Sequence, residues 1–354
     1  MSDYCFFAVS VNMVNTFSGK KLDVSYYLHY KKPLWNAIVI IYVFGGYCGA
    51  IALLLLPNIW LNILGVVLLT HSLVLSAYLS HEFIHGTIFT NMRWNAVGGN
   101  IMLWLNGGCY ARFKDLAQEH IFHHVNKVDS VVFDLAGFIN NRTAPIRGLI
   151  IALEWLYFPV ISFILQFRAL TAPFWNPQRR DQRLRVIIRI IVRGSLFTLL
   201  GLVSLKALAL YFLAYTGMIA VLRFMDALQH TYEAFPVGGS PLPKRDYAYE
   251  QANTFTTLIS RRYWWLNLLV LNFGYHNAHH TVMKCPWHSL HELDRDLFTG
   301  QEVHYLTLPQ LLKNYHRVRV SRIFLGQGKA VDEQGNLALD TFYGAVGVSF
   351  LVKA

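Results

Sequence analysis

Long apolar runs alternate along the chain with charged, histidine-rich stretches. The first run, Leu34–Leu56, ends at Pro57 and Asn58, and a second run follows over Ile59–Ser80. Each run has about the 20 residues that a membrane-spanning helix requires, and the intervening Pro-Asn pair favours a tight turn. The pattern predicts a helical hairpin that returns the chain to the side of the membrane from which it started.

The middle of the chain combines apolar runs with arginines. Ile146–Phe167 is predicted as a third span, although Glu154 and Pro159 interrupt it, and Gly194–Leu222 is predicted as a fourth. The stretch Arg168–Arg193 between them contains seven arginines. Four simple spans would leave these arginines on the non-cytoplasmic side, which conflicts with the tendency of positive charge to stay in the cytoplasm.

Two arrangements would remove this conflict. Either Leu184–Val192 lies along the membrane interface with its arginines reaching the head groups, or the segment 146–167 does not cross. An even number of crossings between residues 124 and 276 would keep the histidine-rich stretches on one side. Trp94–Gly108 is apolar, broken by glycines and too short to span, so we expect it to lie in the interface or to cap a buried site.

The composition agrees with a membrane protein. Of 354 residues, 54% are hydrophobic and 14% charged, whereas a soluble domain has about 25% charged residues. The net charge is +11, and the basic residues flank apolar runs without forming a tract. This distribution favours an anionic membrane surface or an acidic soluble partner over nucleic acid. The four scattered cysteines contain no CxxC pair, which argues against a thiolate metal site.

These patterns predict an all-α, polytopic membrane protein in three parts. Residues 1–33 are expected to be a cytoplasmic leader, residues 34–300 a membrane domain, and residues 301–354 a cytoplasmic C-terminal tail. Lysines just before the first apolar run place its start in the cytoplasm. The expected fold has about four transmembrane helices and a cytoplasmic helical cap that contains the histidine clusters.

Eight of the 15 histidines fall into three short clusters with helical spacing. Residues at i, i+3 and i+4 lie on one face of a helix. The members are His81 and His85 in SHEFIHG, His120, His123 and His124 in QEHIFHHVN, and His276, His279 and His280 in YHNAHH. Imidazole binds iron, zinc, copper and nickel, and no cluster contains a competing thiolate. The sequence predicts an all-nitrogen site for two metals.

The first cluster can also be interpreted as a zinc-protease motif. His81-Glu82-Phe83-Ile84-His85 matches HExxH, in which two histidines bind zinc and the glutamate acts as a base. Such a protease needs only one further ligand, which would leave five of the six other clustered histidines unexplained. A purely structural role is also disfavoured, because ionisable groups at membrane depth are costly and usually functional.

The combination of HEFIHG, HIFHH and HNAHH resembles the three histidine boxes of the membrane fatty-acid desaturase and hydroxylase superfamily. HNAHH is followed by Pro286-Trp287 and Leu290, as in many members, and LQHTYE at 228–233 is similar to a QHxxE-type element that precedes the third box in acyl-lipid desaturases. The resemblance covers roughly residues 34–300. It is specific to the superfamily and much less so to any one reaction.

The resemblance implies two non-haem irons. Carried over by position, one iron would take His81, His124, His276 and His280, and the other His85, His120, His123, His279 and His230. Asp226 lies one helical turn before His230, where relatives have an asparagine that reaches iron through water. Asp226 would therefore bind iron, orient water or support a ligand, and Glu82 would support a ligand. Asp129 and Asp134 either support histidine N–H groups or are merely solvated.

The expected activity is that of a non-haem diiron fatty-acyl desaturase, which uses O2 to remove hydrogen from an unactivated C–H bond and introduce a double bond. A hydroxylase, or a fatty-acid decarboxylase that forms terminal alkenes, would share the metal site, and the unusual segment EWLYFP at 154–159 keeps the decarboxylase open. The alternative of a different class is the HExxH zinc membrane protease.

Electrons are expected from outside the chain, because neither an HPGG haem segment nor a GxGxxG dinucleotide motif is present. A ferredoxin or a cytochrome b5-like protein, both usually acidic, would dock on the basic cytoplasmic face. The other partners implied are the membrane and a lipid or acyl substrate. The sequence has no eukaryotic targeting signal, which favours a bacterial inner membrane over the endoplasmic reticulum.

Overall fold

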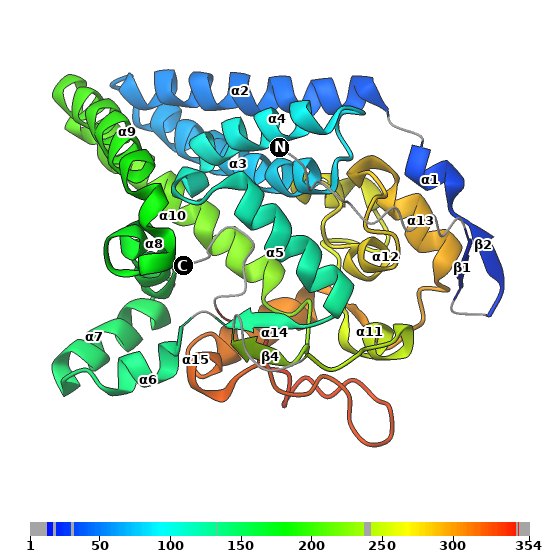
Figure 1. The fold of residues 1–354 in the computed structure, drawn as a ribbon. Helices are drawn as coiled ribbons and strands as arrows, with labels where there is room; N and C mark the ends of the chain where they lie inside the picture. The colour runs from blue at the N-terminus through cyan, green and yellow to red at the C-terminus, as the bar shows by residue number, and fades with distance from the viewer. Residues whose placement is uncertain are drawn as a thin grey trace.

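The computed structural model describes residues 13–16, 19–29, 32–131, 133–236, 242–344 and 346. These residues form a mostly helical protein with three short two-stranded pairings (Figure 1). The strands pair as β1 with β2 (antiparallel), β3 with β4 and β5 with β6 (both parallel). The predicted all-α class is therefore confirmed.

The elements of the first half of the chain are β1 (Met13–Asn15), β2 (Lys21–Asp23), α1 (Ser25–His29), α2 (Pro33–Leu55), α3 (Ile59–His85), α4 (Met92–Asn106), η1 (Gly108–Tyr110), α5 (Phe113–Asn126), β3 (Asp129–Val131), α6 (Leu135–Asn140), α7 (Ala144–Trp155) and α8 (Val160–Trp175). Those of the second half are η2 (Pro177–Gln182), α9 (Arg183–Val203), α10 (Leu205–Asp226), β4 (Ala234–Pro236), α11 (Tyr247–Asn253), β5 (Thr256–Thr257), η3 (Trp264–Val270), α12 (His276–Thr281), η4 (Trp287–Ser289), α13 (Leu290–Leu297), β6 (Tyr305–Leu306), α14 (Leu308–Val318) and α15 (Arg322–Leu325).

Four helical segments of the described chain are long and apolar enough to cross a membrane: α2, α3, the η2–α9 segment and α10. The predicted hairpin is formed by α2 and α3. Asn58 starts α3 by accepting hydrogen bonds from the backbone N–H groups of Trp60 and Leu61 at 2.8 and 3.3 Å. The sequence-based expectation of about four membrane helices is confirmed.

The prediction for the middle of the chain is wrong in detail. The segment predicted as the third span forms two helices, α7 and α8, which are bent by 113° at a short break. Tyr157 in this break has a φ of 64°, which is unfavourable for a residue with a side chain. Leu184–Val192, which one of the two arrangements placed along the interface, is instead part of the candidate span Pro177–Val203. The predicted fourth span, Gly194–Leu222, is divided at Ser204 between α9 and α10.

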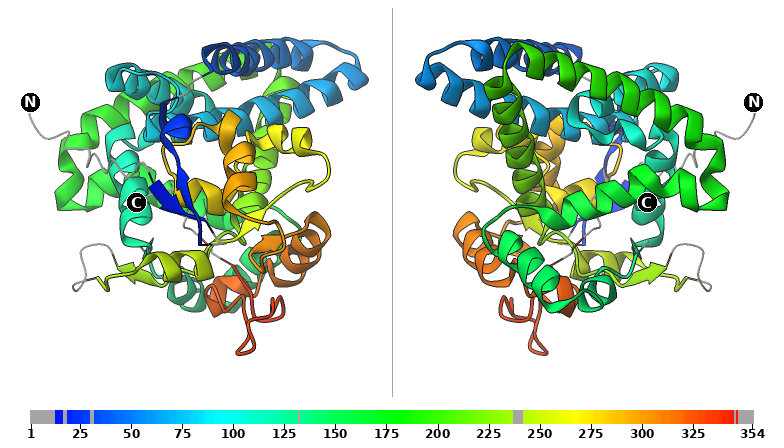
Figure 2. Two further views of the ribbon diagram at one scale, coloured as in Figure 1. Left: turned by 90° about the vertical axis from the view of Figure 1, so that its right-hand side faces the viewer. Right: turned by 90° about the vertical axis from the view of Figure 1, so that its left-hand side faces the viewer.

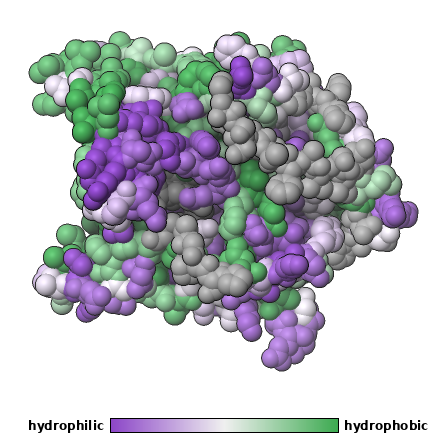
Figure 3. Space-filling view, in the orientation of Figure 1, coloured by the Kyte–Doolittle hydropathy of each residue, from purple (hydrophilic) through white to green (hydrophobic). Residues whose placement is uncertain are grey.

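The outer face of α9 is apolar because arginines of this helix, such as Arg185, turn inward and contact other parts of the protein. Arg185 donates to backbone carbonyl oxygens of Cys109, Tyr110 and Ala111 at 2.6–2.9 Å. These carbonyls follow the C-terminal end of α4, where the helix dipole favours positive charge. The outward side chains of α9 are mainly Ile and Leu, and Leu202 is 81% exposed. Figure 3 shows hydrophobic residues over α2 and the outer part of α9.

The turns of the two long helical pairs meet at one end of the molecule. The ammonium group of Lys206, at the start of α10, donates to the Leu56 carbonyl oxygen and to Asn62 Oδ1 at the α2–α3 turn. The opposite ends of α3 and α10, at His85 and Asp226, lead into the body formed by α5 and α11–α15 (Figures 1 and 2). The histidines therefore lie at the end of the helices away from these turns.

The described part of the C-terminal segment packs against this body. The ring of Phe342 is fully buried against that of Phe255 at 4.9 Å between centroids, and Asn314 donates to the Phe342 carbonyl oxygen at 2.7 Å. The division of the chain into a leader, a membrane domain and a tail stays a prediction.

Candidate metal centre

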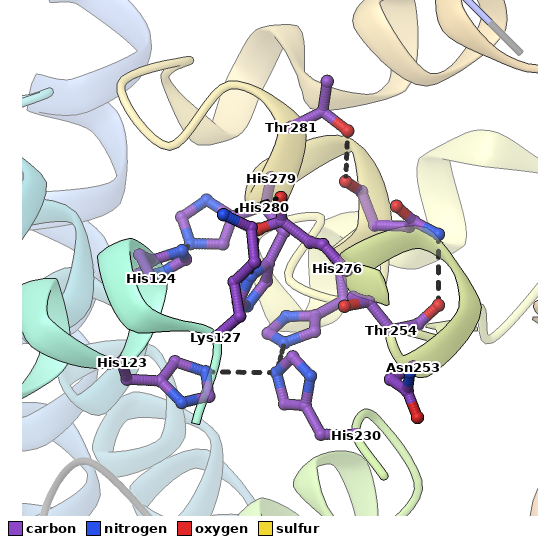
Figure 4. Close-up of polar contacts among 12 residues, drawn as sticks. His123, His124, Lys127, His230, Asn253, Thr254, His276, His279, His280 and Thr281 are labelled. Atoms are coloured by element: carbon purple, nitrogen blue, oxygen red, sulfur yellow. Dashed lines mark hydrogen bonds and ion pairs between the residues drawn. The ribbon is translucent and has the colours of Figure 1, made fainter. Parts of the chain in front are cut away.

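The three predicted histidine clusters converge at one place. They lie in α3, α5 and α12, so each cluster is helical as its spacing predicted. Figure 4 shows rings from α5 and α12 facing one another and His230. His230 itself follows the end of α10 and forms a β-bridge with Thr254. The prediction that it lies one helical turn after Asp226 is wrong, because α10 ends at Asp226.

The first group of ligand-type atoms comes from all three clusters. One ring nitrogen from each of five histidines lies within 4.8 Å of all the others: His81, His85, His120, His124 and His279. The Nε2 atoms are 2.8 Å apart between His85 and His120, and 3.1 Å apart both between His120 and His124 and between His124 and His279. All five residues are buried.

A second group adjoins the first. Ring nitrogens of His123, His230 and His280 also lie within 4.8 Å of one another. His276 joins them, because its Nε2 atom is 2.6 Å from that of His230. The rings of His124 and His280 are 4.1 Å apart between centroids, so the two groups share a boundary. Nine histidines thus form two adjoining nitrogen-rich groups.

The grouping of the ring nitrogens differs from the sequence-based division of these histidines between two metals. His120 and His124 were expected in different sets but lie in one group, and His123 lies in the other. The helices explain the observed division. At about 3.6 residues per turn, the residue at i+4 is rotated about 40° from residue i in one sense and the residue at i+3 about 60° in the other, so the two edges of the shared face can serve different groups. On α5 the i,i+4 pair therefore stays together, and His123 belongs to the opposite group.

The geometry fits metal ions. Imidazole nitrogens bind metals such as zinc at about 2.0–2.1 Å, which places neighbouring ligand atoms about 3 Å apart. The Nε2 atoms of both His120 and His124 contact two other Nε2 atoms, and one ring proton cannot satisfy two such contacts. Burial lowers the pKa of both rings well below its ordinary value, with nearby histidines adding to the effect. The rings are neutral, so their lone pairs are available to a cation.

Glu82, which was predicted to support a ligand, contacts the first group from outside. Its Oε1 atom lies 3.4 Å from His81 Nδ1. Its Oε2 atom accepts from the Thr87 hydroxyl at 2.6 Å and from the Trp287 backbone N–H at 3.1 Å. The carboxylate is therefore held facing the ring nitrogen that would not bind metal, which fixes the orientation of the ring.

Asp129 contacts a histidine of the second group in the same way, through the Nδ1 atom of His123. Its Oδ1 atom is 3.1 Å from His123 Nδ1, and Gln327 from the C-terminal segment donates to its other oxygen. Burial raises the pKa of Asp129, but the hydrogen bonds from His123 and Gln327 outweigh burial and bring it below its ordinary value. Asp134 does not support a histidine: it accepts from the Gly137 backbone N–H at 2.8 Å and starts α6.

Sequence reasoning missed Glu250 in α11. Its Oε1 atom lies 3.4 Å from His280 Nδ1, and its Oε2 atom lies 3.7 Å from the Lys127 ammonium. Burial raises the pKa of Glu250 to about 7, although Lys127 and His123 oppose that rise. The Tyr232 hydroxyl also lies 3.4 Å from His280 Nδ1. No motif spacing links residue 250 to a box, whereas Tyr232 lies within LQHTYE.

Asp226 is the last residue of α10, and its side chain is partly buried. Its Oδ1 atom is shielded from solvent and has no hydrogen-bond partner among the described residues. The positive charge of Arg322 acts on this carboxyl group through space. The predicted role of Asp226 at a metal, directly or through water, stays a prediction.

The histidine groups lie within a segment that matches a known protein family. A family model described as "Fatty acid desaturase" matches residues 58–311. The matched segment contains all nine histidines of the two groups. No curated protein matches the chain.

Proposed function

The chain belongs to the fatty acid desaturase family, and from that premise we propose that it is a diiron enzyme that introduces a double bond into a fatty acyl chain. The observation that carries this proposal is the pair of adjoining histidine groups at the end of the membrane helices. The proposed iron ligands are His81, His85, His120, His124 and His279 for one ion, and His123, His230, His276 and His280 for the other.

Two irons, when bound, would supply the O2-dependent removal of hydrogen from an unactivated C–H bond, for which a protein side chain is too weak a base. The protein's own residues hold and orient the site. Glu82, Asp129 and Glu250 each lie 3.1–3.4 Å from a histidine Nδ1 atom, which favours Nε2 as the metal-binding nitrogen. Eight of the nine proposed ligand histidines, all except His123, are buried, which would limit the access of water to a reacting carbon held there.

A zinc protease is the less favourable interpretation of HExxH. In that mechanism the glutamate must face a water molecule bound to zinc. Both Oε2 contacts of Glu82 are instead made with Thr87 and the Trp287 backbone, and His81 and His85 lie among three further ring nitrogens. These contacts support a structural role for Glu82 in a polynuclear site.

We also propose an electron donor and an orientation in the membrane. The electron donor is proposed to be a ferredoxin or a cytochrome b5-like protein, because the chain has a net charge of +11 and such donors are usually acidic. The histidine side of the membrane helices is proposed to face the cytoplasm of a bacterium. Lysines near the start of α2 support this sidedness.

Product analysis tests the proposed reaction. Expression of the full chain should yield cellular lipids with an additional double bond at unchanged chain length, and a His120→Ala variant should not. An odd-carbon 1-alkene in the headspace would identify a decarboxylase, and a hydroxylated chain a hydroxylase. Either product, or no change in the lipids despite the presence of the protein in the membrane, would contradict desaturation.

A further inference from the structure

A cavity of about 290 Å³ lies among the helices that precede and follow α9. It is bounded by the C-terminal end of α4, by α8 and by the facing helices α9 and α10. Its lining is mainly aromatic and aliphatic, as is common in ligand-binding sites. Asn106 lines the cavity and donates to Ser80 Oγ at 3.2 Å, and Ser80 directly precedes His81. One wall of the cavity therefore contacts the helix that contributes the first box.

The cavity also reaches the outer surface of the membrane helices. Phe167 in α8 and Phe212 in α10 line it, and these side chains are 65% and 46% exposed. Both helices face outward at this point with other apolar side chains. An acyl chain could therefore enter the cavity sideways from the bilayer, without first passing through water.

Two arginines line this apolar cavity, and they differ in how their charge is compensated. Arg223 makes an ion pair with Glu154, with two N–O distances of 2.9 and 3.0 Å. Arg193 is 8% exposed and donates to the Trp104 carbonyl oxygen at 2.6 Å. Its guanidinium group also lies over the Phe197 ring at 5.2 Å. Within the described part of the chain, no ion pair includes Arg193.

A buried guanidinium group without a counter-charge is costly, and more so inside a membrane helix. The Trp104 carbonyl, the Phe197 ring and the neutral side chains of Cys109 and Tyr110, which also contact Arg193, compensate only part of that cost. A carboxylate would complete the compensation, because it accepts two hydrogen bonds from the planar guanidinium group. The arrangement of one uncompensated arginine in an apolar cavity is therefore complementary to an amphiphile with a single anionic head.

We propose that the cavity binds an unesterified fatty acid and that Arg193 pairs with its carboxylate. This inference rests on the proposed function, and it specifies the form in which the acyl substrate arrives. A methyl ester or a thioester has no formal charge at the carbonyl group and would leave Arg193 uncompensated.

Equilibrium binding of radiolabelled palmitate and of methyl palmitate to the purified full chain in detergent tests this assignment. Wild type should bind the acid more tightly than the ester. Arg193→Gln should weaken binding of the acid by about tenfold to a hundredfold, as expected for loss of a charge-assisted hydrogen bond, and should leave binding of the ester unchanged. Arg193→Lys, which keeps the charge but not the planar fork, should fall between the two.

Arg189→Gln is the matched control, because Arg189 lies one turn earlier on α9 and does not line the cavity. It should bind the acid as wild type does. Equal acid binding by Arg193→Gln and wild type, or equal binding of acid and ester by wild type, would overturn the assignment. If Arg193→Gln does not fold, a wild-type level of acid binding by a folded Arg193→Lys would overturn the bidentate pairing. Metal content is measured on the same samples, so a failure of the diiron proposal is recognised separately.

Discussion

Replacement of Asp129 by asparagine should loosen one metal ion and leave the other in place. The Asp129 carboxylate lies 3.1 Å from His123 Nδ1, and the Val128 carbonyl oxygen lies 3.0 Å from the same atom. In Asp129→Asn the ring can keep its orientation through Val128, but it loses the negative charge that makes its other nitrogen a stronger ligand. His123 belongs to the second histidine group alone, so the effect should be confined to that group.

The size of the effect follows from this geometry. Loss of a carboxylate behind a metal-binding histidine typically lowers metal affinity by about 10–100-fold. That range corresponds to about 1.4–2.7 kcal/mol of binding free energy. The retained bond to Val128 places the expected result near the lower end, and removal of both contacts would place it near the upper end.

Chelator competition on purified, iron-loaded protein measures this effect. Asp129→Asn should release one of two irons at about a tenfold lower chelator concentration than wild type, and the second iron should be released as in wild type. Asp134→Asn is the control, because asparagine starts a helix as well as aspartate does and Asp134 contacts no histidine. Unchanged release in Asp129→Asn, or equal loss of both irons, would refute the reasoning.

Three further predictions follow from individual contacts. His276→Ala should abolish product and lower bound iron while the protein stays in the membrane fraction; full activity would remove His276 from the ligand set. Glu154→Gln should leave Arg223 buried without its counter-charge and cost about 3–5 kcal/mol in denaturation of the solubilised protein, whereas a cost under about 1 kcal/mol would show that the pair is solvated. Burial raises the pKa of Asp294 from 3.8 to about 7, against the hydrogen bond from Tyr305. Because the folded-state pKa lies above the unfolded one, stability should fall as the pH rises from about 4 to about 7, and Asp294→Asn should lose this component of the pH dependence in thermal denaturation.

The features that the sequence predicted correctly depend on local periodicity. The α2–α3 hairpin follows from two apolar runs around Pro57 and Asn58, and the box histidines lie on helices because their spacing matches one helical face. These signals need no knowledge of which segments meet in space. The convergence of the three boxes was inferred from their shared chemistry, and the short distances between ring nitrogens of His85, His120 and His279 agree with it.

The features that were missed depend on contacts between distant segments. The arginines of α9 conflict with a membrane span only while their partners are unknown; Arg185 finds carbonyl groups more than seventy residues earlier in the chain, around Tyr110. Glu250 lies beside His280 only because α11 packs next to α12. Gln327 reaches Asp129 from outside the segment that the family model matches.

The expected division of the histidines differs from the observed grouping of ring nitrogens for another reason. It was transferred by position from a family resemblance, and a linear motif does not specify how a helix is rotated. In the folded chain the rotation of α5 directs His120 and His124 to one group and His123 to the other. A rule that kept the i,i+4 pair of α5 together would have given the observed division of that box.

The metal content of the purified full chain tests the diiron proposal most directly. After expression with iron available, elemental analysis of wild-type protein should find two irons per chain, held by two adjoining groups of five and four histidines. His120→Ala and His123→Ala should each lower that content, because one histidine lies in each group. A single zinc ion per chain, unaffected by His123→Ala, would contradict the diiron site and favour the HExxH protease.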